Sequence, residues 1–495
     1  MIPFFVIIPL AAAFVMVMLS RIDERAQDLF AAITGFAMLL LSVFTVFAVG
    51  KAPSNILVHK VGGWTPPVGV SMVVDGLASL MLLIVGIVAF FVAVYSTGYM
   101  KQYTDKWKFY TLFFIMLAGI NGVIVAGDIF NLYVFLEIAA IAAYFLVAYG
   151  TGAEELEASF KYAVMGTVAS CFIFLGIAFL YGYTSTLNMA DMSLVIGIKG
   201  AGRIIPFVSV LFLMGFGLKA ALVPFHSWLA YAHSSAPAPV SAMLSGVLIK
   251  VLGVYALSRI LFNVFGMTPE VSIILMVFAV LSMVVGSILA FGQTDIKRLF
   301  AYSTVSQMGY VALGLAVATP LSIFGALFHL FNHSIFKSLL FLDSGSIERV
   351  SGTRDLNKMS GILVKAPITG YTSLVAALSI CGVPPLGGFW SKLIIIFACI
   401  QAGRLGLAAV AVVVSVLTLG YYFKALTPAL FGTAKEAVKE KAHFSMNIAM
   451  AALAVLVVLS ALTLIPPISN ILFDGAVKSL TGGITYANIV FGALK

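Results

Sequence analysis

Five charged residues lie inside long apolar stretches of this sequence, and they are the groups with which the chain could do chemistry. Glu137 stands near the start of the apolar run at 132–150, and Lys219, Lys250, Lys337 and Lys392 lie within similar runs. One charge at mid-membrane costs at least ~2.5–3.5 kcal/mol, so five unpaired charges would cost about 12–18 kcal/mol. Static salt bridges or lysines that extend to the interface are the alternatives. A buried hydrophilic axis, with groups that are paired, hydrated or neutral, explains all five better.

Two histidines share a helix face with one of these lysines. In the stretch FHLFNHSIFKSLLF, His329, His333 and Lys337 stand at positions i, i+4 and i+8, which places them on one side of a helix. Histidine titrates near neutral pH, so this row could pass protons. Structural hydrogen bonding is the main alternative. A histidine pair at this spacing also suits zinc, but no third ligand accompanies it and Lys337 would repel a cation, so no metal site is expected.

Helix-breaking residues stand beside two of the lysines. Pro224 follows Lys219 in GLKAALVPFHSW, and the prolines and glycines of SICGVPPLGGFWSK precede Lys392. Because proline lacks an N–H, each break frees backbone carbonyl groups. Broken helices at membrane depth persist only where protein or water satisfies the freed groups, and paired breaks are typical of transport sites. The alternative is that prolines are simply common in membrane helices. That explains a single break well, but it explains a lysine beside each of two breaks less well.

The composition supplies the elements that must position these residues. Of 495 residues, 62% are hydrophobic and 9% charged, against about 25% charged in soluble proteins. We therefore predict an all-α polytopic membrane protein. The apolar runs predict fourteen spans, the twelfth of them interrupted, at about residues 2–20, 28–49, 71–97, 108–126, 128–149, 159–183, 205–228, 237–262, 270–291, 299–317, 321–343, 365–403, 406–431 and 445–467.

Weak internal similarities suggest two related five-helix units. The breaks at Pro224 and Pro385 lie 161 residues apart, and Phe–Lys pairs recur at 160–161 and 336–337. This pattern is that of an inverted repeat with broken helices 7 and 12. The expected divisions are residues 1–107 for helices 1–3, 108–262 for the first repeat, 270–431 for the second, and 445–495 for helix 14 and a C-terminal tail.

Basic residues are distributed unevenly between the two sets of loops. Sixteen Lys and Arg residues, Lys297 among them, lie in or beside loops after odd-numbered spans, and eight, Arg259 among them, lie on the other side. Cytoplasmic loops are enriched in Lys and Arg. We therefore expect a multi-pass protein of the cell (cytoplasmic) membrane with both termini on the non-cytoplasmic side.

Several function classes are excluded by what the sequence contains. The net charge of +9 lies mostly in short loops, without a dense basic patch, so no nucleic-acid partner is expected. Cys171, Cys381 and Cys399 lie in apolar segments, so no disulfide framework is expected. No CxxC, phosphate-binding or dinucleotide motif is present, and we expect no cofactor. The N-terminal run lacks a basic region and is interpreted as a first span rather than a cleaved signal.

His226 and His233 flank the stretch HSWLAYAHSSAPAPVS after the first break. They could connect the polar axis to the surface. They could equally cap and brace a loop by hydrogen bonds, and the sequence does not choose between the two.

Four motifs resemble one known family over nearly the whole chain. They are GDIFNLYVFLE at 127–137, residues 217–255 ending in SGVLIKVLGVY, DIKRLFAYSTVSQMGY at 295–310 and GVPPLGGFWSK at 382–392. The chain resembles the antiporter-like subunits shared by respiratory complex I, energy-converting membrane-bound hydrogenases and multisubunit Mrp Na⁺/H⁺ antiporters. The stretch at 127–137 is most similar to the D-type component of Mrp antiporters and its hydrogenase counterpart, and lysine rather than glutamate at 392 departs from the glutamate-bearing complex I type.

The resemblance implies roles for the buried residues. By position, Glu137 and Lys219 match the family's Glu–Lys pair, and Lys250 matches its connecting lysine. His329, His333 and Lys337 match the relay of the eleventh helix, and Lys392 matches the group at the second break. We thus expect proton translocation within a multisubunit membrane complex, with Na⁺ as the candidate counter-ion. A subunit of a redox-driven pump, with electron transfer in partner chains, is the alternative, and a passive scaffold is a further one. No feature indicates a stand-alone enzyme.

Overall fold

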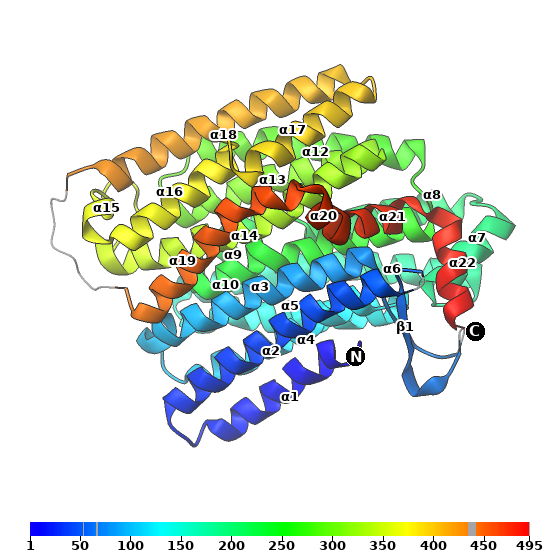
Figure 1. The fold of residues 1–495 in the computed structure, drawn as a ribbon, viewed down its shortest axis with the longest axis horizontal. Coiled ribbons are helices and arrows are strands. Elements are labelled where there is room, and N and C mark those ends of the chain that lie inside the picture. Colours follow the sequence, from blue (N-terminus) through cyan, green and yellow to red (C-terminus); the bar gives the residue numbers. More distant parts are fainter. Residues whose placement is uncertain (53, 66–67, 434–441, 495) are drawn as a thin grey trace.

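The computed structural model describes residues 1–52, 54–65, 68–433 and 442–494, and most of them are helical (Figure 1). The long helices run roughly parallel to one another and to the long axis of the molecule. Nine helical segments among the described residues are long and apolar enough to cross a membrane. They are Glu24–Lys51, Gly76–Gln102, Lys106–Val125, Ile129–Gly150, Ala153–Thr184, Ala238–Val264, Pro269–Phe291, Leu405–Phe431 and Phe444–Leu464.

The principal elements follow the predicted apolar runs. They are α1 (Phe4–Leu19), α2 (Glu24–Lys51), α3 (Gly76–Tyr99), α4 (Lys106–Val125), α5 (Ile129–Val147), α6 (Ala153–Thr184), α8 (Ile204–Lys219), α9 (Ser227–Ser235), α10 (Ala238–Met243), α12 (Pro269–Phe291), α13 (Ile296–Val317), α14 (Pro320–Ser351), α15 (Ile362–Lys365), α16 (Pro367–Cys381), α17 (Gly387–Gln401), α18 (Leu405–Phe431) and α19 (Phe444–Leu459). The predicted interruption at 365–403 is present, as two helices on either side of residues 382–386.

Polar caps define where several of these helices begin. The Asp75 carboxylate accepts a hydrogen bond from Ala78 N at the start of α3, and Asp128 accepts two from the first turn of α5. Thr319 and Ser322 form a reciprocal capping box at the start of α14. Such side chains satisfy backbone N–H groups that have no partner within the helix, which matters more at membrane depth than in water.

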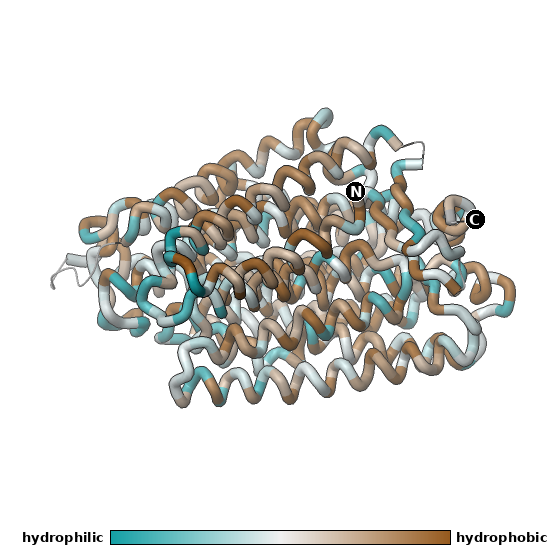
Figure 2. Tube along the Cα trace, turned by 90° about the horizontal axis from the view of Figure 1, so that it is seen from below, coloured by the Kyte–Doolittle hydropathy of each residue, from teal (hydrophilic) through white to brown (hydrophobic). Residues whose placement is uncertain are grey.

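Helix α14 forms the centre of the molecule. It packs against α13, α16, α17, α10 and α19, and its side chains are buried along most of its length. Large apolar side chains are exposed instead on outer helices such as α2, α6 and α18, as suits contact with lipid. Figure 2 shows apolar residues along the helices and more polar residues toward both ends of the molecule.

Three regions differ from the expectations. Residues 71–74, predicted to begin the third span, form β2 (Ser71–Val74), which pairs antiparallel with β1 (Leu57–Lys60). The predicted C-terminal tail contains α21 (Gly475–Thr481) and α22 (Gly483–Leu494), and α22 packs against an unpredicted helix, α7 (Met189–Lys199). The eighth span continues beyond α10 through π-helical turns, η4 (Leu244–Leu248), η5 (Lys250–Tyr255) and η6 (Arg259–Val264).

Candidate functional site

Glu137 and Lys219 form an ion pair between α5 and the end of α8. Lys219 Nζ lies 3.6 Å from Glu137 Oε1, and Ser170 of α6 donates a hydrogen bond to the same oxygen. At about this separation and an effective dielectric near 20, two unit charges attract by roughly 4 kcal/mol. The Lys219 side chain is 3% exposed and that of Glu137 25%. The pair therefore connects the interior with the outer face of the chain.

The first helix break follows Lys219 directly. Helix α8 ends at this lysine and α9 begins at Ser227. The intervening backbone is held by side chains from its surroundings, because Ser282 Oγ accepts from Val223 N at 2.9 Å and Trp228 Nε1 donates to Leu218 O at 3.1 Å. The break is thus an ordered structure with backbone groups satisfied inside the protein, as membrane depth requires.

Lys250 lies at the first position of the π-helical turn η5 and is fully buried. Its Nζ donates hydrogen bonds to the backbone carbonyls of Ser245 and, at 2.9 Å, of Gly246. A wide π turn changes which carbonyl groups are available inside a helix, and such turns are frequent at functional sites. Neutral carbonyl groups, rather than a carboxylate, are therefore the partners of this lysine.

Two neighbouring hydroxyl groups of α13 link Lys250 with Lys337. Ser245 Oγ is hydrogen-bonded to Thr304 Oγ1 at 2.8 Å, and the adjacent Ser303 accepts a hydrogen bond from Lys337 Nζ. Lys337 also donates to Tyr422 Oη of α18 at 3.3 Å. Ser303 and Thr304 also share one backbone acceptor, Phe300 O, at 2.9 Å each. Groups that both donate and accept therefore lie close to the partners of both buried lysines.

The histidines of α14 continue the polar row toward the second break. His329 and His333 are fully buried, and their ring centroids lie 6.1 Å apart. His329 Nδ1 is hydrogen-bonded to Ser391 Oγ of α17 at 2.8 Å, and its ring lies 5.7 Å from that of Tyr310. Ser391 immediately precedes Lys392, so the row reaches the fourth lysine.

Lys392 is held by the broken end of α16. Its Nζ donates to Ile380 O at 2.7 Å and lies 5.3 Å from the centre of the Tyr310 ring. The chain can turn here because Gly388 packs directly on Ser379, where an added Cβ would lie only 1.8 Å from the carbonyl oxygen. The freed carbonyl at the end of α16 is thus the partner of this lysine.

The two further histidines do not flank an open loop, contrary to the sequence interpretation. Residues 227–235 between them form α9, and His233 is a fully buried member of that helix. Its ring stacks on Phe341 of α14 with centroids 4.5 Å apart. His226 is half-buried and contacts the edge of the Tyr302 ring.

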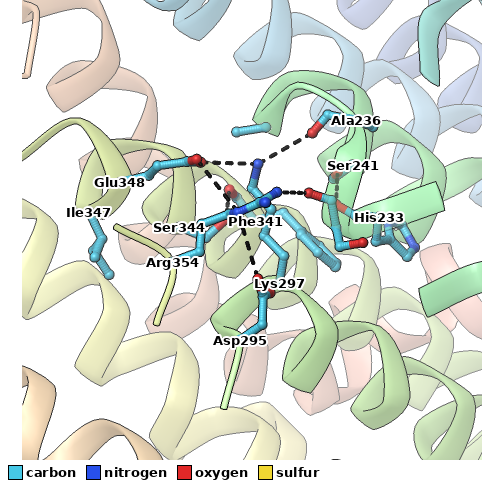
Figure 3. A network of polar contacts seen from close by, with 12 residues as sticks. His233, Ala236, Ser241, Asp295, Lys297, Phe341, Ser344, Ile347, Glu348 and Arg354 are labelled. Atoms are coloured by element: carbon cyan, nitrogen blue, oxygen red, sulfur yellow. Dashed lines mark hydrogen bonds and ion pairs between the residues drawn. The ribbon is translucent and has the colours of Figure 1, made fainter. Parts of the chain in front are cut away.

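A network of charges at one end of α13 and α14 was not predicted from the sequence (Figure 3). Lys297 was counted as a loop residue, yet its side chain is 3% exposed, and its Nζ lies 3.2 Å from Glu348 and 3.3 Å from Ala236 O. Arg354 contacts Asp295 at 3.6 Å and Glu348 at 3.8 Å. Burial alone would lower the pKa of Arg354, but these carboxylates raise it above the ordinary value. The sequence signal that could have indicated this network is the charged motif DIKR at 295–298.

A second missed cluster ties the C-terminal helix to the core. Arg259, also counted as a loop residue, forms a buried bidentate pair with Asp75, with one contact of 2.7 Å. Tyr486 of α22 donates to Asp75 at 2.7 Å, and Arg259 donates to Tyr255 Oη at 3.1 Å. A bidentate arginine pair with its remaining donors satisfied is a typical structural device.

The fold and this site define a class: a polytopic helical membrane protein whose interior carries a row of ionisable groups between two helix breaks. The family model described as "NADH:quinone oxidoreductase/Mrp antiporter, TM" matches residues 126–418. A second, described as "NADH-Ubiquinone oxidoreductase (complex I), chain 5 N-terminus", matches residues 64–110. The chain belongs to the NADH:quinone oxidoreductase/Mrp antiporter transmembrane family.

Relatives in this family cover most of the chain. The D-type component of the Na⁺/H⁺ antiporter of Alkalihalophilus pseudofirmus is 35% identical over 89% of this chain and 90% of its own length. The N-type component of the NADH-quinone oxidoreductase of Desulforudis audaxviator is 40% identical over 74% of each chain. Among solved structures, a chain of the Mrp complex from Dietzia sp. DQ12-45-1b is 27% identical with a TM-score of 0.90, and 99% of each chain is covered.

Proposed function

We propose that this chain is the proton-translocating, D-type component of a multisubunit Na⁺/H⁺ antiporter of the Mrp kind. Its similarity to the D-type component of a Na⁺/H⁺ antiporter over 89% of the chain supports this assignment. The observation that carries it is the Glu137–Lys219 pair, a buried lysine 3.6 Å from a partly exposed carboxylate at a helix break.

The pair acts as a charge switch. Near Glu137, the protonated form of Lys219 is favoured by roughly 4 kcal/mol, which corresponds to about a thousandfold in proton affinity. Movement of Glu137 away from the lysine removes that attraction, and the buried lysine then releases its proton toward Lys250.

The proton then follows the polar row through the centre of the molecule. From Lys250 it passes the hydroxyl groups of α13 to Lys337, then His333 and His329, and it reaches Lys392 beside the second break. The hydrogen bonds from Ser245 to Thr304 and from His329 to Ser391 support this order. Each group in the row can hold or pass a proton, as a relay requires.

The membrane topology is part of this proposal. The chain has fourteen spans, with α8–α9 and α16–α17 as the broken seventh and twelfth. Ten of them form two inverted five-helix repeats, at 108–262 and 270–431. The segments 1–107 and 445–495 lie before and after the repeats. The two breaks, each beside a lysine, support the repeat, and the excess of basic residues after odd-numbered spans supports cytoplasmic loops there. Both termini then lie on the non-cytoplasmic side of the cell membrane.

A second candidate function is proton pumping in a redox-driven complex of the NADH:quinone oxidoreductase or hydrogenase type. The 40% identity to the N-type component of an NADH-quinone oxidoreductase favours it. The same row of residues would then carry the protons, and electron transfer would lie in partner chains.

Substitution of Glu137 tests the proposal. Glu137→Ala in the assembled complex leaves Lys219 without its counter-charge, and we expect proton flux into vesicles to fall by about two orders of magnitude at normal assembly. Glu137→Asp keeps the charge with a shorter reach and retains part of the flux. Near-normal flux for the alanine variant would contradict the charge switch.

A further inference from the structure

The proposed relay does not use Asp343, a buried carboxyl group without a cationic partner among the described residues. Asp343 lies on α14 with no exposed surface, and its Oδ1 accepts a hydrogen bond of 2.8 Å from Thr372 of α16. Its Oδ2 has no hydrogen-bond partner within the described ranges. An unpaired carboxylate at such a site is strongly disfavoured relative to the neutral acid. The position therefore favours the neutral acid over a permanently charged carboxylate.

Three hydroxyl-bearing side chains lie between Asp343 and a cavity at the end of the helices. The cavity has a volume of about 300 Å³ and is lined by residues at the start of α16 and α19, Thr369 among them. Thr369 Oγ1 is hydrogen-bonded to Ser346 Oγ at 2.7 Å. Thr372 Oγ1 can donate to Thr369 O at 3.1 Å or to the Asp343 carboxyl group. All three hydroxyl-bearing side chains are buried.

On the inner side, two further buried polar side chains lie about 16 Å along α14 from Asp343, close to the level of His329. Asn332 precedes Asp343 by about three helical turns, on the same face of α14, and Ser379 follows Thr372 by about two turns on α16. Asn332 Oδ1 and Ser379 Oγ are both buried without a hydrogen-bond partner in the described chain. Asn332 and Ser379 pack against Gly387 and Gly388, the first two residues of α17. These glycines lie about one turn before Ser391, which is hydrogen-bonded to His329.

We propose that Asp343 is a proton-carrying residue of a second uptake branch, which starts at this cavity and runs inward between α14 and α16. The inference rests on the proposed function. Each hydroxyl group accepts one proton and passes on its own, and Asp343 holds the proton as a neutral acid. Every transfer breaks one O–H bond and forms another. Buried polar atoms such as Ser379 Oγ and Asn332 Oδ1 are the kind that ordered water satisfies.

The groups around Asp343 leave its carboxyl group available for this role. Tyr95 and Tyr99 of α3 are the titratable side chains beside it, and Tyr95 Oη donates a hydrogen bond to Leu342 O at 2.8 Å. The neighbouring segments α10, α16 and α19 carry hydroxyl-bearing, amide or apolar side chains, and Lys365 at the end of α15 is the charged group among the described residues that line the cavity. Farther along α14, Glu348 is paired with Lys297 at 3.2 Å and Arg349 donates to a backbone carbonyl at 3.2 Å. Lys337 precedes Asp343 by six residues and bonds to hydroxyl groups of α13 and α18.

The test compares variants of the full complex in vesicles, with flux measured across a range of pH. We expect Asp343→Asn, which keeps the shape but cannot titrate, to lower proton flux per assembled complex by roughly tenfold and to flatten its pH dependence. Asp343→Glu should restore most of both. Thr372→Val should lower flux in the same direction. Thr45→Val is the matched control, because Thr45 is another buried threonine bonded to its own helix, far along the chain on α2.

The outcomes for the second branch and for the charge switch can be told apart. Normal flux and pH dependence in Asp343→Asn, alongside an inactive Glu137→Ala, would overturn the second branch and leave the charge switch standing. Normal flux in both variants would overturn both. If Asp343→Asn fails to assemble, Thr372→Val decides: flux equal to that of Thr45→Val would overturn the branch, and a selective loss would support it.

Discussion

At the scale of single residues, the four buried lysines differ in their partners. Lys219 faces a carboxylate at 3.6 Å. Lys250 and Lys392 donate to backbone carbonyl groups, and Lys337 donates to hydroxyl groups. A carbonyl or hydroxyl group stabilises an ammonium group less than a carboxylate does. In the proposed relay, these three lysines are the groups that pass protons on, and Lys219 is the one that a carboxylate controls.

Lys392 offers the sharpest test at this scale. Lys392→Arg keeps a positive charge but introduces a group that does not release its proton in proteins. We expect this variant to assemble and to lose proton flux by about tenfold or more, whereas Lys392→His and Lys392→Glu, which can titrate, retain more. Flux per assembled complex in the three variants is the measurement.

A result in which arginine performs as well as lysine would contradict the relay. Lys392 would then be an electrostatic support for the break, and the outlet of the proton path would have to be sought elsewhere, first around His226 and His233.

At the scale of elements, the two broken helices are rigid rather than loose. Side chains of neighbouring helices satisfy the backbone around the first break, and glycines let α16 and α17 pack closely at the second. Gly388 lies so near Ser379 that an added Cβ would be 1.8 Å from its carbonyl oxygen. The break is thereby fixed in the geometry that presents Ile380 O to Lys392.

Gly388→Ala should therefore destabilise this junction. Overpacking of this kind costs typically about 1–3 kcal/mol, and we expect a lower midpoint in thermal unfolding of the detergent-purified complex together with reduced flux. Gly182→Ala on α6 is the matched control, since an added Cβ there meets no atom within 4 Å, and alanine favours a helix. Equal midpoints for the two variants would show that the junction can relax without cost.

At the scale of the whole molecule, the chain presents an incomplete surface. The Glu137 side chain is a quarter exposed although it belongs to the central ion pair, and large apolar side chains cover the outer helices. A charged group on an otherwise apolar face at membrane depth needs a polar partner or water. A neighbouring subunit that covers α5 and α6 would supply that environment.

The isolated chain should accordingly fail to exchange Na⁺ for H⁺. We expect purified chain in liposomes to show no coupled exchange above that of protein-free vesicles, because the setting of Glu137 is incomplete without its partners. The assembled complex, reconstituted in parallel, provides the positive control, and its Glu137→Ala variant provides the negative one. Robust exchange by the chain alone would contradict this expectation.

Local signals in the sequence account for much of the fold and for the residue types of the site. Apolar runs predicted the helical segments, Pro and Gly predicted both breaks, and the spacing of His329, His333 and Lys337 predicted one helix face. These signals are local because helix period and backbone chemistry act over a few residues. The same logic could not separate a loop charge from a buried one, so Lys297 and Arg259 were misjudged.

Only the tertiary structure decided which groups meet. Asp75, Arg259 and Tyr486 belong to one cluster although they are hundreds of residues apart, and no local pattern links them. Asp343 became a candidate site because Thr372 of α16 donates to it and because Thr369 of the same helix lines a cavity. The C-terminal helix α22 packs on α7, and its Tyr486 donates to the buried Asp75. A side chain's burial and partners depend on the packing of distant segments, so sequence determines which residues can carry a proton, and packing determines the path between them.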